Sequence, residues 1–196
     1  MTYTSRSDFP DTFPDTKTQY CWQCKATGVS KVGTDPVKYQ CETCSAVSDR
    51  VLIYDPNMQM YFDEQERLVH ESCGVFIMRG DGKILLFQRT KFPYLLTIPA
   101  GHIEQGEEPL AAAKRESEEE VGIKADNLTV LFDGTIEGDS CLGGADIHNW
   151  HAYTQKITDG ADVVLDEEGS DWGWYDRSEL SSANTVQPVL YILEHS

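Results

Sequence analysis

The chain has no long apolar run and no leader-like segment. No stretch approaches the roughly 20 consecutive apolar residues that a membrane-spanning helix needs. The first twenty residues also lack the charged-then-apolar pattern of a secretory signal. We therefore expect a cytoplasmic protein with reduced thiols and no membrane association. Internal repeats are absent as well.

Basic side chains are also few. The 196 residues include 16 Lys and Arg against 33 Asp and Glu, a formal charge of −17. A surface of this sign repels nucleic acid and anionic membranes. A mild local excess of lysine near the N-terminus leaves nucleic-acid binding there as a minority alternative, carried by Lys17, Lys25, Lys31 and Lys38. We expect no nucleic-acid partner.

Only six cysteines occur, and four of them form two close pairs. Cys21 and Cys24 lie in CWQC, Cys41 and Cys44 in CETC, with sixteen residues between the pairs. This spacing matches a four-thiolate zinc site, and two disulfides in a secreted domain are the alternative. A segment of about thirty residues buries too little core to fold alone, so a metal would supply the missing energy. We predict a zinc ribbon at residues 17–50.

The length fits one ordinary domain plus this small module. Residues 1–16, rich in Thr, Asp and Pro, are expected to be disordered, residues 51–70 to be a linker, and residues 71–196 to be the main domain. Of the two remaining cysteines, Cys73 is expected in a strand, whereas Cys141 lies in a polar loop without an assigned role. The sequence is also compatible with a homodimer.

Glu116, Glu119 and Glu120 are spaced at i, i+3 and i+4, so they share one face of a helix. Like charges at this spacing cost roughly 0.2–0.5 kcal/mol per pair in an exposed helix. A solvated acidic face is one explanation. The other explanation is that the three carboxylates bind a divalent cation, whose charge offsets their repulsion. Hard oxygen ligands suit Mg²⁺ or Mn²⁺.

Local signals around these glutamates predict an α/β fold. Pro109 suits the first turn of the helix, and Gly122 suits its C-terminal cap. Gly80-Asp81-Gly82 predicts a hairpin turn between two strands within residues 73–89. Further strands are expected at 95–98, 128–133 and 148–157, and a last helix at 186–193. The result is a mixed sheet between helices.

The stretch from Gly101 to Ile123 resembles the Nudix box. Its seven fixed positions are filled by Gly101, Glu107, Arg115, Glu116, Glu119, Glu120 and Gly122. A chance match at a given start has a probability of about 10⁻⁸. One position of the box that is apolar in the family pattern holds Ser117 instead. We expect Ser117 to pack on the sheet with Leu110, Ala113 and Val121, and to bond back to the carbonyl of Ala113.

The resemblance implies a Nudix-type α/β/α sandwich that hydrolyses pyrophosphate bonds with Mg²⁺ or Mn²⁺. Glu116 and Glu120 would be the main metal ligands, joined by Glu119 and the Gly101 carbonyl. Arg115 would orient a neighbouring carboxylate, and Glu107 would support the loop or the metal shell. Candidates for the general base lie further along the chain, at Asp166, Glu167 and Glu168.

The substrate is less well defined. IPAGHIEQGE resembles the approach to the box in ADP-ribose and nucleotide-sugar pyrophosphatases, so these compounds are the first candidate substrates. Nucleoside triphosphates are the second. The zinc ribbon resembles that of NADH pyrophosphatases, but their signature after the box is missing. Trp150 and His148 share a strand face and could bind substrate, Trp150 by stacking on a base. A nucleotide-sensing regulator and isopentenyl diphosphate isomerase remain as alternatives.

Zinc content tests the cysteine interpretation. Purified protein should contain about one zinc ion held by Cys21, Cys24, Cys41 and Cys44, since they supply the ligands of one site. Elemental analysis measures the metal, and mass spectrometry measures the oxidation state of the thiols. Protein without zinc that carries disulfides would contradict both the ribbon and the cytoplasmic expectation.

Overall fold

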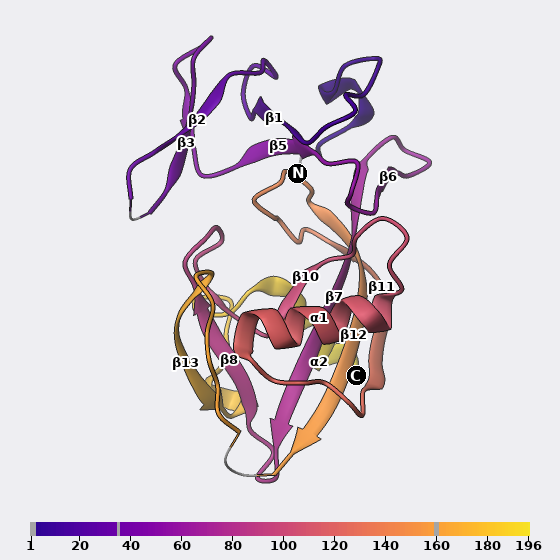
Figure 1. Ribbon diagram of the computed structural model, residues 1–196, viewed down its shortest axis with the longest axis vertical. Helices are drawn as coiled ribbons and strands as arrows, with labels where there is room; N and C mark the ends of the chain where they lie inside the picture. The colour runs from indigo at the N-terminus through magenta and orange to yellow at the C-terminus, as the bar shows by residue number, and fades with distance from the viewer. Residues whose placement is uncertain (1–2, 35, 159–160) are drawn as a thin grey trace.

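Figure 1 shows the computed structural model of the protein, which describes residues 3–34, 36–158 and 161–196. The parts of the expected tail, ribbon and main domain that fall on positions 1, 2, 35, 159 and 160 lie outside the described residues. The chain forms a large α/β unit, at the bottom of the view, and a small unit of short strands above it.

The large unit is built on an eight-stranded sheet. Across the sheet, the main strands are β11 (Thr129–Glu137), β12 (Ile147–Ile157), β7 (Leu68–Arg79), β8 (Ile84–Arg89) and β13 (Gly169–Tyr175). β12 and β7 run parallel, and the other neighbours in this order run antiparallel. Three short strands pair with β7 or β8, namely β6 (Met60–Phe62), β9 (Leu96–Thr97) and β10 (Ala100–His102). The sheet is therefore mixed, as predicted.

Two helices, α1 (Pro109–Val121) and α2 (Gln187–His195), cover opposite faces of this sheet. Side chains alternate along a strand, so Val75 of β7 packs toward α1 whereas Phe76 packs toward α2. The predicted α/β/α sandwich is confirmed. Within the described residues, neither helix is long and apolar enough to cross a membrane.

The ends of α1 follow the sequence signals. Pro109 is its first residue, and Gly122 caps it in the left-handed conformation with φ 71°. The Gly122 N–H bonds to the carbonyls of Glu118 and Ser117. A glycine adopts this conformation without the steric cost of a Cβ. The helix therefore ends where the chain must turn back to the sheet.

The packing face of α1 differs in two ways from the expected one. Ala113, Ser117 and Val121 are fully buried as expected, but Leu110 is 43% exposed. The Ser117 hydroxyl donates to the carbonyl of Ile123 at 2.8 Å, and not to that of Ala113. Ile123 follows the glycine cap, where its carbonyl would otherwise be left without a donor. Ser117 thus ties down the turn after the helix.

The small unit consists of two sheets. β1 (Thr18–Cys21) pairs with β5 (Val51–Tyr54), and β2 (Val29–Val32), β3 (Lys38–Cys41) and β4 (Val47–Ser48) form the other. Each cysteine pair begins at the last residue of a strand and continues into a turn. This arrangement of two turns on short hairpins is that of a small zinc ribbon.

The N-terminal segment is ordered where the structure describes it, unlike the expected disordered tail. Phe9 is buried, and its ring meets those of Phe13, Tyr20 and Phe62 at centroid distances of 5.8–5.9 Å. The Thr4 hydroxyl donates to the Gly144 carbonyl at 2.7 Å. The rings of Phe9 and Phe13 bury apolar surface and so contribute to ordering this otherwise polar segment.

The expected linker at residues 51–70 is also structured. It contains β5, β6 and the first residues of β7. Leu52 and Leu68 are fully buried in the small core that Phe9 also enters. The two units are therefore joined by a shared apolar cluster rather than by a flexible connection.

This cluster gives a stability prediction. Phe9→Ala should destabilise the packing of the N-terminal segment by about 3 kcal/mol, because it leaves a cavity where a buried aromatic ring was. Thermal unfolding should show the loss, and limited proteolysis should cut residues 3–16 faster. Val130→Ala, at a position 64% exposed, is the matched control and should change neither. Equal stability of Phe9→Ala and the parent protein would contradict the packing.

Candidate active site

Gly101 lies where the loop before α1 meets the glutamate face of the helix. It pairs with Cys73 across β10 and β7. A Cβ at this position would lie 2.2 Å from Oε1 of Glu116. Only glycine therefore lets the Glu116 carboxylate approach the backbone this closely. The first and fourth fixed positions of the box depend on each other sterically.

Glu120 lies one turn further along α1 and is only 5% exposed. Its Oε2 accepts a hydrogen bond from the Ala100 N–H at 2.7 Å. Burial raises the pKa of Glu120 well above its ordinary value, and burial also raises the pKa of Glu116. Each charged carboxylate has lost the water that would stabilise it. The pair is a desolvated acidic site.

Arg115 is hydrogen-bonded to three of the box carboxylates. Its Nε and Nη2 donate to the two oxygens of Glu107 at 3.0 Å. Its Nη1 donates to Glu116 at 2.6 Å and to Glu119 at 3.1 Å, and Nη2 reaches the His102 carbonyl at 3.3 Å. The bond to Arg115 lowers the pKa of Glu107. The guanidinium therefore holds the carboxylates in place, the orienting contact that the resemblance implies.

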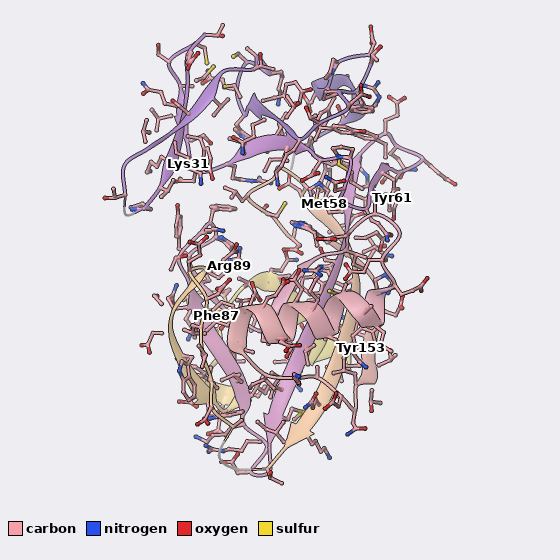
Figure 2. The ribbon with its side chains drawn as sticks, viewed as in Figure 1. Lys31, Met58, Tyr61, Phe87, Arg89 and Tyr153 are labelled. Carbon is pink, nitrogen blue, oxygen red and sulfur yellow. The ribbon has the colours of Figure 1, made fainter. Side chains whose placement is uncertain are left out.

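These side chains face a cavity of about 730 Å³ between the two units. Gly101, Arg115, Glu116, Glu119 and Glu120 contribute to its wall from the box. Three cationic side chains also line the cavity, those of Lys17, Arg89 and Lys91. Arg89 comes from β8, and Met58 lines the cavity from the connection between the units (Figure 2). The cavity therefore places acidic and basic groups around one space large enough for a nucleotide-sized ligand.

Of the expected base candidates, Asp166 and Glu168 line the cavity, and Glu167 is not among its lining residues. Glu168 forms an ion pair with Lys91. The backbone N–H of Asp166 donates to the Glu120 carbonyl at 3.3 Å. The segment is thus fastened to the end of the glutamate helix.

Trp150 and His148 both line the cavity, but both side chains are largely buried and contact Asp139. Trp150 is 7% exposed, and its Nε1 donates to Oδ2 of Asp139 at 2.8 Å. His148 is 2% exposed, with Nδ1 3.2 Å from the same Asp139 oxygen. Burial raises the pKa of Asp139 to about 6. Trp150 is therefore hydrogen-bonded to the half-buried carboxyl of Asp139, and His148 lies beside the same group.

Three cavity residues were not singled out from the sequence as site residues. His70, His102 and Cys141 lie beside His148, although they are far apart along the chain. Burial lowers the pKa of His102 to about 3 and that of His148 to about 4. These imidazoles are neutral near pH 7. No spacing rule connects them, since only the sheet and the loop before β12 bring them together.

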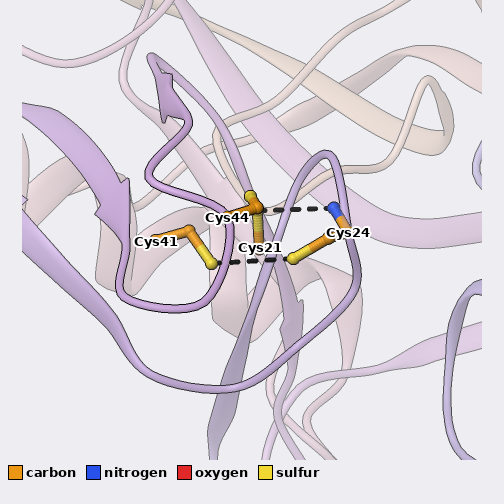
Figure 3. A group of neighbouring side chains, drawn as sticks. All are labelled: Cys21, Cys24, Cys41 and Cys44. Carbon is orange, nitrogen blue, oxygen red and sulfur yellow. Dashed lines mark hydrogen bonds between the residues drawn. The ribbon is translucent and has the colours of Figure 1, made fainter.

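The four paired cysteines come together in the small unit (Figure 3). Sγ of Cys21 lies 3.7 Å from that of Cys44, and Sγ of Cys24 lies 3.6 Å from that of Cys41. Sulfurs that share one tetrahedral zinc are about 3.8 Å apart, given Zn–S bonds near 2.3 Å. A backbone hydrogen bond from Cys44 is the main cause that lowers the pKa of Cys41 to about 6. The cluster has the spacing of metal ligands and not of disulfides.

Comparisons with known proteins agree with this geometry. The family model of the NUDIX domain matches residues 68–194. Isopentenyl-diphosphate Delta-isomerase of Serratia proteamaculans is 32% identical over 132 residues, covering 63% of this chain and 71% of that protein. ADP-ribose pyrophosphatase of Bacillus subtilis is 41% identical over 63 residues, covering 31% of this chain and 34% of that protein.

A solved structure, that of a C. elegans Ap4A hydrolase binary complex, superposes with a TM-score of 0.54 and 25% identity. It covers 64% of this chain and 93% of the hydrolase. Residues 68–194, which the family model matches, make up the large unit with its box helix. The chain belongs to the Nudix family and is a Nudix-type pyrophosphohydrolase with a small cysteine-rich unit ahead of the family domain.

Proposed function

We propose that the protein hydrolyses the pyrophosphate bond of a nucleoside diphosphate linked to another moiety, with Mg²⁺ or Mn²⁺ as cofactor. One observation carries the proposal, namely that the buried carboxylate of Glu120 and the half-buried carboxylate of Glu116 both face the cavity. A single guanidinium, Arg115, pairs with three of the four box glutamates, so the box has more negative than positive charge. A divalent cation held by oxygen ligands fits this donor set.

Each residue would contribute a separate part of the chemistry. Glu116 and Glu120 would hold the cation with the Gly101 carbonyl, and Glu119 would bind at the more exposed rim. The bound cation would neutralise phosphate oxygens and make a water nucleophilic. Arg115 and Glu107 would keep the carboxylates oriented through their mutual hydrogen bonds. Asp166 or Glu168 would accept the proton of the attacking water.

The basic residues of the cavity favour a substrate with more than one phosphate. Arg89 and Lys91 lie on the wall that β8 and the following loop provide, and Lys17 reaches the cavity from the small unit. A phosphate would compete with Glu168 for Lys91 and with Asp55 for Lys17. Cations in a partly enclosed cleft attract anionic substrates. ADP-ribose and nucleotide sugars are the first candidates because of the IPAG sequence before the box, and the B. subtilis ADP-ribose pyrophosphatase is among the relatives. Nucleoside triphosphates come next.

Isomerisation of isopentenyl diphosphate is the second candidate, because the Serratia relative is an isomerase of that type. Such enzymes need an active-site cysteine. In the large unit, Cys73 is fully buried, and Cys141 is the cysteine that lines the cavity. The complete set of box glutamates favours hydrolysis. It also argues against a regulator that only senses a nucleotide, since a pure binder does not need every ligand.

Glu120→Gln tests the cation site. It should lower kcat at least about 100-fold, because a metal ligand supplies several kcal/mol of charge stabilisation in the transition state. Glu118→Gln is the matched control, since Glu118 lies on the same helix with a 59% exposed side chain and pairs only loosely with Lys124. It should keep normal turnover. Near-normal turnover in Glu120→Gln would overturn the assignment.

The same variant should change the pH dependence of stability. The pKa of Glu120 is raised in the folded protein, so its contribution is favourable at low pH and is lost as pH rises through that pKa. Without added Mg²⁺, Glu120→Gln should melt about 3 °C higher than the parent at pH 8, the shift that ~1 kcal/mol gives at this size. Near pH 4 the difference should vanish. A variant that melts lower at pH 8 would contradict the buried charge.

A substrate panel tests the reaction itself. ADP-ribose, nucleotide sugars, NADH, a dinucleoside polyphosphate, nucleoside triphosphates and isopentenyl diphosphate are each incubated with Mg²⁺. Hydrolysis is read as phosphate after phosphatase coupling, and isomerisation is read by chromatography of the products. We expect turnover on a linked nucleoside diphosphate. Conversion of isopentenyl diphosphate without hydrolysis would favour the isomerase. Tight filter binding to a DNA duplex at about 150 mM salt, with no turnover on any compound, would favour a regulator.

A further inference from the structure

Three histidines and one cysteine converge on one point outside the box glutamates. His70 comes from β7, His102 from β10, His148 from β12, and Cys141 from the loop before β12. One ligand atom of each side chain lies within 4.8 Å of those of the other three. Neither the hydrolysis proposed above nor the zinc ribbon uses this group.

The distances between these side chains are those of ligands around one ion. Nδ1 of His70 lies 3.2 Å from Nε2 of His102 and 3.6 Å from Sγ of Cys141. In a tetrahedral zinc site, bond lengths near 2.05 Å to nitrogen and 2.3 Å to sulfur give edges of about 3.3 Å between nitrogens and about 3.6 Å between nitrogen and sulfur. Both contacts match these edges.

The burial of these groups is costly without a metal. His70 is fully buried, and its Nε2 has no hydrogen-bond partner among the described residues. His148 is 2% exposed. One proton on the His70 imidazole cannot satisfy its contacts with both His102 and Cys141. A cation bound at Nδ1 of His70 would satisfy the contacts of that nitrogen with His102 and Cys141, while Nε2, on the far side of the ring, would carry the proton.

Asp139 supplies the outer partner that a metal-bound histidine usually has. Its Oδ2 lies 3.2 Å from Nδ1 of His148, within ion-pair distance although not aligned as a hydrogen bond, and Nε2 of His148 would bind the ion. Carboxylates in this position fix the ring and its tautomer. The charges also balance, since a divalent ion would face the thiolate of Cys141 and the carboxylate of Asp139. The neighbouring Arg50 is already neutralised by Asp146, with which it forms a 2.9 Å ion pair.

We propose that His70, His102, Cys141 and His148 bind one transition-metal ion of the zinc class. Imidazole and thiolate ligands select zinc over magnesium or calcium, and four protein ligands make a closed, structural site. The thiol would lose its proton on binding.

The site would join the two units of the protein. Arg50 donates to the carbonyl of Cys141 at 2.8 Å and to that of Ala145 at 2.9 Å. The backbone N–H groups of Val51 and Ile53 donate to the carbonyls of Leu142 and Gly143. β5 therefore rests on the loop that carries Cys141. An ion that binds this loop to β7, β10 and β12 would fix the small unit over the active-site cavity.

Metal content after exposure to Zn²⁺ tests the proposal independently of activity. The full chain is loaded with Zn²⁺, dialysed against excess Mg²⁺ to clear the box carboxylates, and analysed for zinc. The parent should hold about two ions, one on the four cysteines and one on the new site. His102→Ala should retain about one. His151→Ala is the matched control, because His151 lies on β12 but pairs with Glu71 and Asp133 instead, and it should retain two.

Cobalt spectroscopy covers the case in which His102→Ala does not fold. In Co²⁺-loaded protein, Cys141→Ser should lower the sulfur-to-cobalt charge-transfer absorbance by about one fifth, because five thiolate bonds become four. A parent that holds one zinc, lost entirely in Cys24→Ser, would overturn the proposal. So would a folded His102→Ala protein that retains two zinc ions, or a Cys141→Ser protein with unchanged absorbance.

Discussion

The hydrogen bonds of Arg115 hold the glutamate cluster of the box together. Four carboxylates close to one another repel, and one of them, that of Glu120, is buried, so a neighbouring positive charge stabilises the cluster. The guanidinium meets Glu107, Glu116 and Glu119 and also the carbonyl of His102. It therefore fastens the loop before α1 to the helix. The position of Gly101, and with it the wall of the cavity, depends on this arrangement.

The small unit participates in the site through its contacts with the loop before β12. Arg50, Val51 and Ile53 bond to that loop, and Thr4 bonds to Gly144 within it. Lys17 reaches the cavity from the same side. A cysteine-rich module of this size has little core of its own, so its fixed place over the cavity comes from the shared cluster of Phe9, Leu52 and Leu68.

Much of the large unit could be predicted from local patterns. The helix after Pro109 and its end at Gly122 follow from capping signals, and the hairpin turn follows from Gly80-Asp81-Gly82. The predictions from the sequence failed where tertiary contacts outweighed the local composition of the chain. Residues 3–16 are polar on average, but Phe9 and Phe13 find aromatic partners on β1 and β6. Leu110 is apolar but exposed, because it lies at the start of α1, beyond the region that packs on the sheet.

The sequence by itself determined the box, the spacing of the glutamates and the two cysteine pairs, since each depends on residues close together along the chain. Only the tertiary structure brought His70, His102, Cys141 and His148 to one point. Their separations along the chain obey no helical or strand period. The pairing of β10 and β12 with β7, and the fold of one loop, decide which side chains meet, and such long-range pairing is not encoded in any short segment.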